Sequence, residues 1–496
     1  MKKSESAELT TSRRLHPVSV IFFIGKSVKD LLYPMIAFIL TTVFRDDINW
    51  LWLFGGIAVM MIIMLTIGLL TWYRFVYYLD QGSLRVDHGI FIRKKLWITK
   101  DRVQAVDTTA GVLHRIFGLL KLQVETAGGK KPEVVLNAIS GREAEQIRIA
   151  LGLMEVSQPE IISDVPQATP VEKAAPVEQR IRLSFSDLLI YSTTSGKIGV
   201  VLAVIGAAYS QLDEWLAETL DIWGFISYWM GSAQIVWLIV FLIVIAWLLA
   251  VLFTSIREYG FTLQLKGDKL VIERGLLERK QVTVPLQRIQ AVHLVENVFR
   301  RPFGLVTVHI VSAGYAGKEG ESAILFPLVR ERELAAFLAR FTPQYQLADE
   351  WSRLGKRSLL SFMLVPVILT LAISIPAIIW IPYSLGWFAL LLPLLAVLWS
   401  WLRYRQTGWS LLQQQIAIQY GSFNRHRILV PKRRIQWNRL SQSVFQVRKE
   451  LATLNIALTS GALPALFYIK HLPFNIGMEL KTWMIGKKVN PPQQSK

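Results

Sequence analysis

Side chains that could carry chemistry are few in this sequence, and they form no known catalytic motif. The chain contains 7 histidines and no cysteine, which excludes disulfides, thiolate metal sites and a cysteine nucleophile. No His-Glu-x2-His or similar metal-ligand spacing is present. Gly25-Lys26-Ser27 has the residues that end a phosphate-binding loop, but Val20 occupies the position of the required upstream glycine. We therefore predict no metal, no cofactor and no enzymatic activity.

One set of residues recurs along the chain, and it contains glycine, arginine and glutamine. Three stretches align without gaps from Leu84, Leu270 and Ile416. The repeated positions are Gly89, Gly275 and Gly421; Arg93, Arg279 and Arg425; Arg102, Arg288 and Arg434; and Gln104, Gln290 and Gln436. Such a constant register predicts three copies of one structural unit.

The repeated cations suggest a binding surface. Lys94, Lys280 or His426 follows the first arginine of each copy, and Arg427 lies close by. Near a bilayer, each such cation could attract anionic headgroups by about 1 kcal/mol. Arginine could also pair with a phosphate through two hydrogen bonds. The alternative is that these charges only set the membrane topology. The candidate contacts to anionic lipid or a partner are Arg93, Lys94, Arg279, Lys280, Arg425 and Arg427.

The second arginine and the glutamine of each copy are expected to have a structural role, such as hydrogen bonding at a bulge or strand end. Ligand binding is the alternative for these residues. Because no histidine recurs at an equivalent position in all three copies, histidine catalysis is disfavoured. Nucleic-acid binding is disfavoured as well, because no RNA-recognition or helix-turn-helix pattern is present.

The elements that must position these residues are β-strands. Apolar and polar residues alternate on both sides of each repeated glycine, which predicts a hairpin or bulge where the glycine has a positive φ. Further strands are expected at Leu122–Thr126, Val308–Ser312 and Leu454–Ala457, followed by helices that begin near Gly141, Val329 and Pro473.

The ends of the modules differ between copies. Ser140 is expected to cap the first of the three helices, with Glu143 as its capping-box partner. In the third copy, Val447-Arg448-Lys449 replaces a Phe-Gly pair, and we expect the helix after Phe474 to be weaker.

Long apolar segments predict that these modules are attached to a membrane. The sequence is 52% hydrophobic and 18% charged, which is too apolar for an ordinary globular protein. The predicted spans form three pairs: Leu31–Phe44 with Trp50–Tyr73, Ile198–Leu212 with Gln234–Phe253, and Ser358–Ile381 with Tyr383–Leu402. The first members of the first two pairs are short for a span. Lys29 and Lys197 could extend them by reaching the headgroups.

The distribution of charge predicts the orientation. The net charge is +19, yet the loops inside the pairs are acidic or uncharged. They contain Arg45-Asp46-Asp47-Ile48-Asn49 in the first pair, Asp213, Glu214, Glu218 and Asp221 in the second, and the turn 382–386 in the third. By the positive-inside rule, both termini and all three modules face the cytoplasm of a cell membrane.

These features predict an α+β membrane protein with six transmembrane helices in three pairs. Each pair would be followed by a β-barrel or sheet module and a C-terminal helix. The predicted segments are an N-terminal cytoplasmic or interfacial segment (1–25), transmembrane pairs (26–73, 181–256 and 358–403), modules (74–156, 257–341 and 404–486), linkers (157–180 and 342–357) and a tail (487–496).

The Gly-x3-Arg…Arg-[Val/Ile]-Gln pattern, followed in two copies by Phe117-Gly118 and Phe303-Gly304, resembles bacterial pleckstrin-homology-like (PH-like) domains of the second type. The three copies after hydrophobic pairs resemble the YdbT-type members in particular. The resemblance implies PH-like modules and a role in the cell envelope. It also implies a shorter one-module paralogous membrane protein as a partner. Membrane lipids and self-association are the other interactions that we consider.

The leading hypothesis is therefore a non-enzymatic membrane scaffold whose modules bind a protein partner or the anionic inner leaflet. The alternative is a transporter or channel with regulatory modules, in which Pro366, Pro376 and Pro393 break helices around a central site. No carboxylate lies deep within a predicted span, which disfavours transport. A third hypothesis, an enzyme acting on lipid or peptidoglycan precursors, lacks a candidate nucleophile or base.

Overall fold

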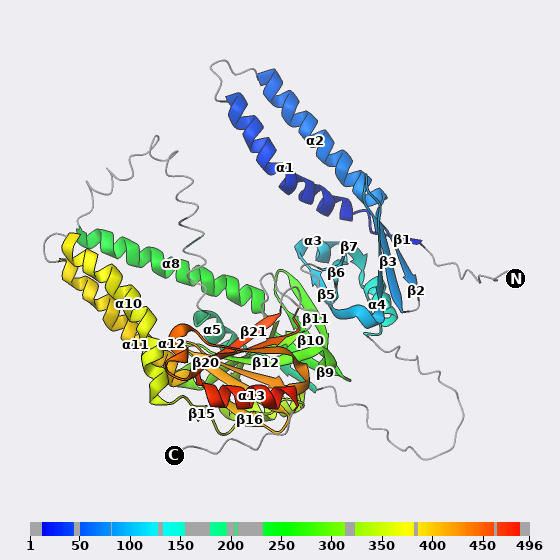
Figure 1. Cartoon of the computed structure of the whole chain (residues 1–496). Coiled ribbons are helices and arrows are strands. Elements are labelled where there is room, and N and C mark those ends of the chain that lie inside the picture. The colour runs from blue at the N-terminus through cyan, green and yellow to red at the C-terminus, as the bar shows by residue number, and fades with distance from the viewer. Residues whose placement is uncertain are drawn as a thin grey trace, which may run out of the picture. The chain divides into compact units, whose positions relative to one another are not determined.

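The computed structural model describes most of the chain as an α+β protein (Figure 1). The described residues are 12–43, 50–80, 82–126, 132–153, 179–195, 232–312, 323–380, 385–460 and 464–486, with positions 203 and 206. They divide into two compact units. Unit 1 comprises Met1–Val177, Gly267–Val271 and Glu278–Pro285, and unit 2 comprises Glu178–Lys266, Ile272–Leu277 and Leu286–Lys496. We describe each unit by itself.

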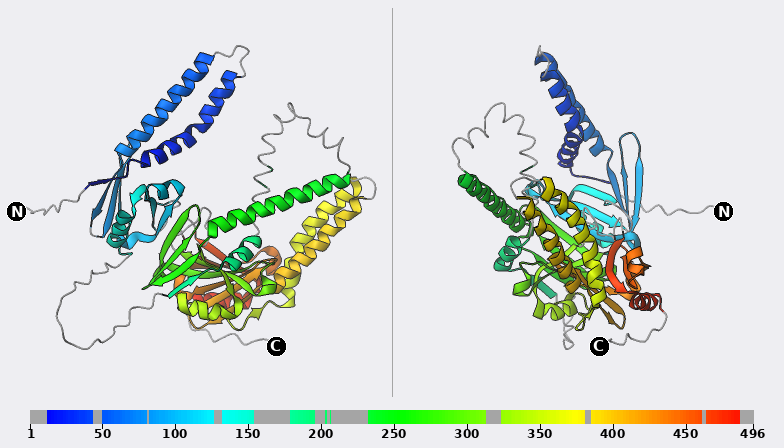
Figure 2. Two further views of the ribbon diagram at one scale, coloured as in Figure 1. Left: turned by 180° about the vertical axis from the view of Figure 1, so that it is seen from behind. Right: turned by 60° about the vertical axis from the view of Figure 1, so that its left-hand side comes forward.

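Long apolar helices occur in both units. Unit 1 contains α1 (Ser19–Val43) and α2 (Trp50–Tyr73), which form a helical hairpin. Unit 2 contains α8 (Ser232–Glu258), α10 (Lys356–Trp380) and α11 (Leu391–Gln406). In both views of Figure 2, α10 and α11 lie side by side.

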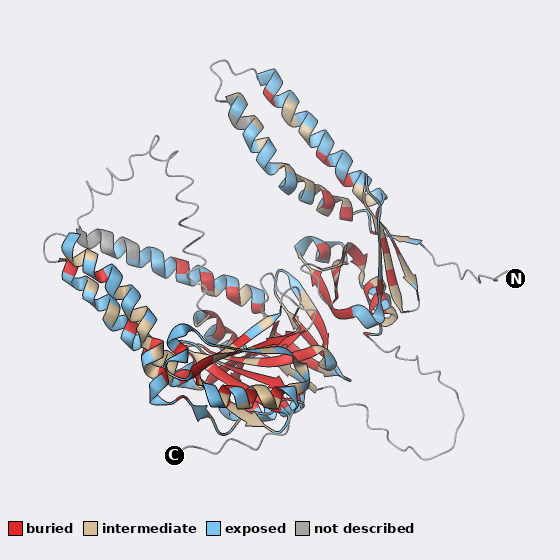
Figure 3. Cartoon of the chain, viewed as in Figure 1, coloured by how far each residue is buried: buried red, intermediate tan, exposed pale blue. Residues whose placement is uncertain are grey.

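Among the residues that the structure describes, four segments are long and apolar enough to cross a membrane: Trp50–Tyr73, Val240–Glu258, Lys356–Trp380 and Gly386–Gln406. At most 17% of the most apolar stretch of each is buried inside the protein, and Figure 3 shows α2, α10 and α11 as mostly exposed. Such apolar, exposed helices belong in a bilayer. Pro366 and Pro376 lie inside α10, which continues through both instead of breaking.

The prediction of six spans is thus supported for four of them. Helix α1 is too charged to be counted as a membrane span, because Lys26, Lys29 and Asp30 all lie within its first half. The predicted span Ile198–Leu212 falls outside the described residues except at positions 203 and 206.

The strands of unit 1 form two sheets. The first has the order β1-β2-β3-β4, and the second includes, in this order, β7-β6-β5-β11. The strands are β1 (Ser12–Arg14), β2 (Val76–Asp80), β3 (Ser83–His88), β4 (Lys94–Thr99), β5 (Val103–Ala110), β6 (Leu119–Thr126), β7 (Val134–Ser140) and β11 (Arg279–Pro285). Leu84 and Ile98 from the first sheet and Leu122 from the second are 1% exposed or less, and Ile147 of helix α4 (Gly141–Ala150) joins them in one core.

The strands of unit 2 form a seven-stranded sheet with the order β14-β13-β12-β18-β17-β16-β15 and a three-stranded sheet with the order β19-β20-β21. The strands are β12 (Ile289–Glu296), β13 (Leu305–Ser312), β14 (Ala323–Arg330), β15 (Ser352–Arg353), β16 (Gly408–Leu412), β17 (Gln415–Gly421), β18 (Arg425–Pro431), β19 (Ile435–Ser441), β20 (Leu451–Leu458) and β21 (Ala465–Pro473). Strands β8 (Gln179–Arg182) and β9 (Thr262–Lys266) pair in this unit, and β10 spans Lys269–Arg274. The short helices are α3 (Val112–Ile116) in unit 1 and α5 (Phe185–Thr193), α9 (Leu334–Phe341), α12 (Val444–Val447) and α13 (Phe474–Ile485) in unit 2.

A short strand before each helix pair belongs to the module that follows the pair. Strands β1, β8 and β15 pair with β2, β9 and β16, respectively. The leucine after each strand is buried: Leu15, Leu183 and Leu354 are 2%, 7% and 5% exposed. Sequence analysis placed these strands in the N-terminal segment, in the first linker and adjoining transmembrane pair, and in the second linker. These strands are too short to show an alternation of apolar and polar residues, although each ends in an arginine that a leucine follows.

The end of the first module confirms one prediction, and the end of the third differs from expectation. The Ser140 side chain accepts from the Glu143 backbone N–H, and the Glu143 carboxylate accepts from the Ser140 N–H, so the capping box is present. In the third module, α13 is longer than α4 or α9. Leu480 and Met484 anchor it in the core, at 1% and 8% exposed. Burial of an apolar face stabilises this helix.

Candidate functional site

The recurring glycine and the first recurring arginine lie on one hairpin, which joins β3 to β4 and is repeated in the other two copies. Gly89, Gly275 and Gly421 begin the turn with φ angles of 116°, 109° and 157°. A methyl group added to Gly89 or Gly421 would lie 2.0 Å from a carbonyl oxygen across the turn. Only glycine fits there, because its backbone tolerates positive φ and it has no Cβ.

The tip of each hairpin is attached to the end of the preceding long helix. In the first copy, Arg74 Nη1 donates to the Ile90 carbonyl at 2.9 Å. In the third copy, the Gln406 amide donates to the equivalent carbonyl, that of Ser422. In the second copy, the backbone N–H groups of Gly275 and Leu276 donate to carbonyls at the end of α8. These contacts hold every tip where an apolar helix ends.

The residue at each tip is apolar and exposed. Phe91, Leu277 and Phe423 occupy equivalent positions and are 97%, 53% and 50% exposed. Sequence reasoning concentrated on the cations and missed these residues, although their position repeats as strictly as that of the arginine. Exposed apolar side chains at the end of a membrane helix fit the boundary between headgroups and acyl chains.

The strand after the tip is added, in two of the three copies, to the sheet of the preceding copy. Strand β11 pairs with β5 and strand β18 with β12, both antiparallel. Arg279 lies opposite Ala110 in the first junction, and Arg425 lies opposite Glu296 in the second. These two pairs are equivalent in the repeat, so both junctions have the same register.

An acid–base contact stabilises each junction. In the first, Lys280 Nζ lies 2.9 Å from Asp107 Oδ2, and the Asp107 side chain is 3% exposed. Removing such a buried partner leaves an uncompensated charge.

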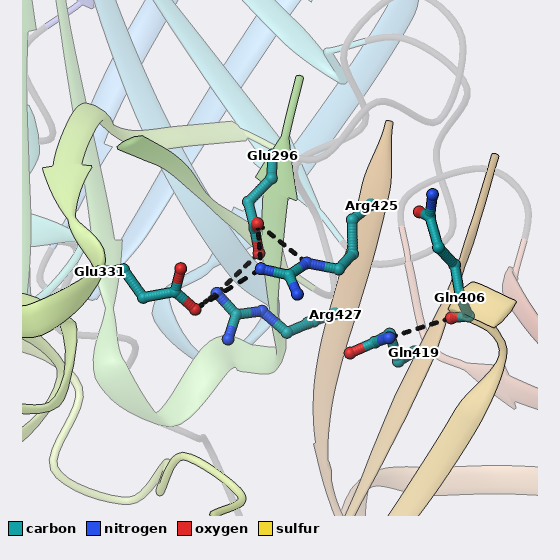
Figure 4. Close-up of polar contacts among 6 residues, drawn as sticks. All are labelled: Glu296, Glu331, Gln406, Gln419, Arg425 and Arg427. Carbon is teal, nitrogen blue, oxygen red and sulfur yellow. Dashed lines mark hydrogen bonds and ion pairs between the residues drawn. The ribbon is translucent and has the colours of Figure 1, made fainter. Parts of the chain in front are cut away.

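The second junction contains a larger cluster, shown in Figure 4. Arg425 Nε donates to Glu296 Oε2 at 2.8 Å, and Arg427 Nη2 lies 2.7 Å from Glu296 Oε1. Glu331 Oε1 lies 2.9 Å from the same Arg427 nitrogen. The Glu296 side chain is only 2% exposed. Lys280, Arg425 and Arg427, three of the predicted contact residues, are therefore held by carboxylates of the preceding copy.

The first copy differs from the other two at this strand edge. Among the residues that the structure describes, no strand pairs with the edge of β4 opposite β3. Arg93 and Lys94 are exposed, as is the neighbouring Lys95. Arg279, the remaining predicted contact, is exposed beside the first junction. Binding of lipid or a partner by these residues stays a prediction.

The second repeated arginine and the glutamine lie at a bulge. Arg102, Arg288 and Arg434 each end a short 3-10 helix. The following pairing shifts register around Gln104, Gln290 and Gln436. Such a bulge bends the strand in which it lies, where the chain passes from one sheet to the next. The structural role of these residues stays a prediction.

Three histidines that do not recur in the repeat come together in unit 2. His293 Nε2 and His426 Nδ1 lie 3.0 Å apart, and the His293 and His309 rings are 5.9 Å apart. Burial is the main cause that holds the pKa of His293 well below 6.5, and the two neighbouring histidines lower it further. Burial also lowers the pKa of His426. Within the described ranges, no group of three or more potential ligands is arranged to hold a metal ion.

We expect this histidine cluster to make the second junction sensitive to acid. The unfolded chain binds a proton at His293 below about pH 6.5, whereas the folded chain does so only at lower pH. Lowering the pH from 7.5 to 5.5 should therefore cost on the order of 1 kcal/mol of stability. His293→Gln should remove that part, while His16→Gln, at an exposed position, should not. Thermal unfolding at both pH values measures the difference, and equal pH dependence in wild type and His293→Gln would contradict the assignment.

A cleft lies beside the hairpin in two copies. In the first, Tyr73, Arg74, His88, Arg93 and Lys95 are among the residues that line about 320 Å³. In the third, the cleft holds about 360 Å³, and its lining includes Arg403, Tyr420, His426, Tyr468 and Lys470. Both combine cations with aromatic rings at the end of a long helix. This chemistry suits a phosphate-bearing headgroup.

The architecture and the repeat define a membrane protein built from PH-like modules. Bacterial PH domains match at residues 35–154, 201–343 and 362–484, so the chain belongs to the bacterial PH-domain family. It is 33% identical to the UPF0699 transmembrane protein YdbT of Bacillus subtilis (strain 168) over 474 residues, covering 92% of this chain and 94% of that protein. No solved structure matches the chain. The comparisons confirm the predicted resemblance and a transmembrane protein.

Proposed function

We propose that this protein is a non-enzymatic scaffold of the cell membrane. Its three PH-like modules lie on the cytoplasmic side, rest on the anionic inner leaflet and recruit a protein partner for cell-envelope maintenance or stress protection. One observation carries the proposal: each hairpin joins the end of a long helix at its tip, and in two copies its strand extends the preceding module. These contacts would hold each hairpin tip near the membrane surface.

The leaflet is favoured as a ligand by what surrounds the tips. Phe91 is almost fully exposed, and Arg93, Lys94 and Lys95 follow it within four residues. An aromatic side chain gains free energy at the headgroup boundary, and each nearby cation adds about 1 kcal/mol on an anionic surface.

Depth-dependent quenching tests the contact with the leaflet. Because the chain has no cysteine, a single Phe91→Cys substitution can carry one fluorophore in protein reconstituted with anionic lipid. We expect a lipid-borne quencher to reduce its emission strongly. A Glu145→Cys label, at an exposed position on α4, serves as the control. Equal quenching at the two positions would refute a leaflet-bound tip.

Co-purification tests the scaffold itself. The full chain should retain a stable protein partner when it is isolated from native membranes and from detergent. It should also retain anionic lipid in preference to zwitterionic lipid. Recovery of neither a partner nor selected lipid would overturn the proposal. Robust solute uptake by the purified protein in liposomes would favour the transporter instead.

A further inference from the structure

The first copy has an edge that the other two copies use for a contact between modules. Strand β4 is equivalent to β11 and β18, which each bind the edge of a preceding sheet. In the described part of the chain, β4 pairs with β3 alone. An open strand edge presents unpaired backbone N–H and carbonyl groups, which are a template for another strand.

The outer face of β4 is uncovered as well. Trp97 is 56% exposed, whereas its equivalents Thr283 and Leu429, whose strands pair with the preceding copy, are 5% and 1% exposed. Trp97 packs against the Arg85 guanidinium, with 4.7 Å from the Arg85 Cζ atom to the ring centroid. A large aromatic side chain surrounded by cations is the kind of residue that dominates protein interfaces.

The two existing junctions define what would fit on β4. If a partner strand paired with β4 in the register that the two junctions share, Arg93 would lie opposite the partner residue that takes the place of Ala110 or Glu296. Lys94 would lie near the residue equivalent to Asp107, which holds Lys280 in the first junction. A strand that reproduces these contacts must run antiparallel to β4. It must also carry a carboxylate at one of the two positions.

A second copy of this chain does not meet the requirement. The strand equivalent to β5 and β12 in the third copy is β19. It pairs with β20 on one side, and its other edge has no strand partner among the described residues. At the position of Asp107, β19 has Arg439, and at the position of Glu296 the chain has Gln442. Arg439 would face the cations of β4, and like charges across a strand pair are destabilising.

We propose that the free edge of β4 binds an edge β-strand of a different protein, antiparallel and carrying a carboxylate opposite Arg93 or beside Lys94. This inference rests on the proposed scaffold function and identifies the surface that such a scaffold uses. The bound strand takes the place that β5 has beside β11 and β12 has beside β18. The partner's sheet then continues the series of modules beyond the first copy.

Photocrosslinking in native membranes tests the site on the full-length chain. The photoreactive amino acid p-benzoylphenylalanine replaces Trp97, and mass spectrometry identifies the attached peptide. We expect an extended segment of another protein with Asp or Glu opposite position 93 or beside position 94. The Arg93→Glu/Lys94→Glu variant should lower the yield at least tenfold. Replacing the partner's carboxylate by lysine should restore it.

A matched variant controls for net charge, and a cysteine pair tests self-association. Arg142→Glu/Arg332→Glu changes two exposed cations that are not part of β4 and should leave the yield unchanged. Lys95→Cys/Leu440→Cys would place two cysteines opposite each other if β4 met β19 of a second copy. We expect no disulfide-linked dimer on oxidation.

Each other outcome overturns the proposal. An adduct that survives the charge reversal, an adduct with a second copy, or a disulfide-linked dimer of the Lys95→Cys/Leu440→Cys variant would each exclude the stated occupant. Co-purifying partners without any adduct at position 97 would exclude the site and leave the scaffold function standing. Absence of any co-purifying partner would exclude the site, and absence of selected lipid as well would remove the scaffold function.

Discussion

Replacing Glu296 by glutamine is expected to destabilise the pairing of β12 with β18 by about 3 kcal/mol. The carboxylate is 2% exposed and contacts Arg425 and Arg427, whose side chains are 19% and 9% exposed. Without it, two poorly solvated guanidinium groups share only Glu331, which is 43% exposed. Removing one partner of a buried ion cluster is costly, because the remaining charge has lost both water and counter-charge.

Hydrogen exchange measures this effect on the protein in a membrane. Backbone amides of β18 should exchange about 100-fold faster in Glu296→Gln, since 1.4 kcal/mol corresponds to a factor of ten. Glu333→Gln is the matched control, because that carboxylate is 60% exposed and 4.0 Å from Arg330. An exposed pair contributes about 0–1 kcal/mol. Similar exchange in the two variants would show that the cluster does not stabilise the junction.

The second large effect is expected for Gly89→Ala, at about 3 kcal/mol or more. Its φ is 116°, and the new methyl group would lie 2.0 Å from the Ile92 carbonyl oxygen. Both the backbone conformation and the close approach oppose a side chain there. The hairpin must open, which displaces Arg93 and Lys94 together.

Another glycine in the same module separates the two causes. Gly118 also has a positive φ, 65°, but a methyl group there meets no atom within 4 Å. Gly118→Ala should therefore cost only about 1 kcal/mol from the left-handed backbone. Thermal unfolding of both variants in the same lipid gives the comparison. Equal losses would mean that the contact with Ile92 is relieved at little cost.

Much of the architecture could be predicted from the sequence because it depends on local patterns. The alternation around Gly89 identifies strands, the apolar run Trp50–Tyr73 identifies a membrane helix, and Ser140 with Glu143 identifies a helix start. The constant offset along each pair of neighbouring copies identifies the three modules. Each pattern reflects backbone geometry or burial over a few residues, so it is readable without knowing the partner strand.

The candidate site was only partly predictable. The recurring arginines were found. The carboxylates that contact the basic residues of the second and third hairpins were not, because Asp107 and Glu296 occupy different positions in their copies. A search for strictly repeated residues passes over such a pair. The apolar tips were missed for a different reason: an exposed Phe91 has meaning only beside the end of a membrane helix.

The sequence by itself determined the repeated modules, their strands, four apolar spans and the basic hairpin. Only the tertiary structure decided that β11 and β18 extend the preceding copy, and that β4 has no strand to extend among the described residues. Backbone hydrogen bonding between strands is the same for any sequence. The alternation of apolar and polar residues therefore cannot predict which strand pairs with the edge of a sheet. That choice depends on side chains distant in the chain, such as Asp107 and Lys280, that meet only in the folded protein.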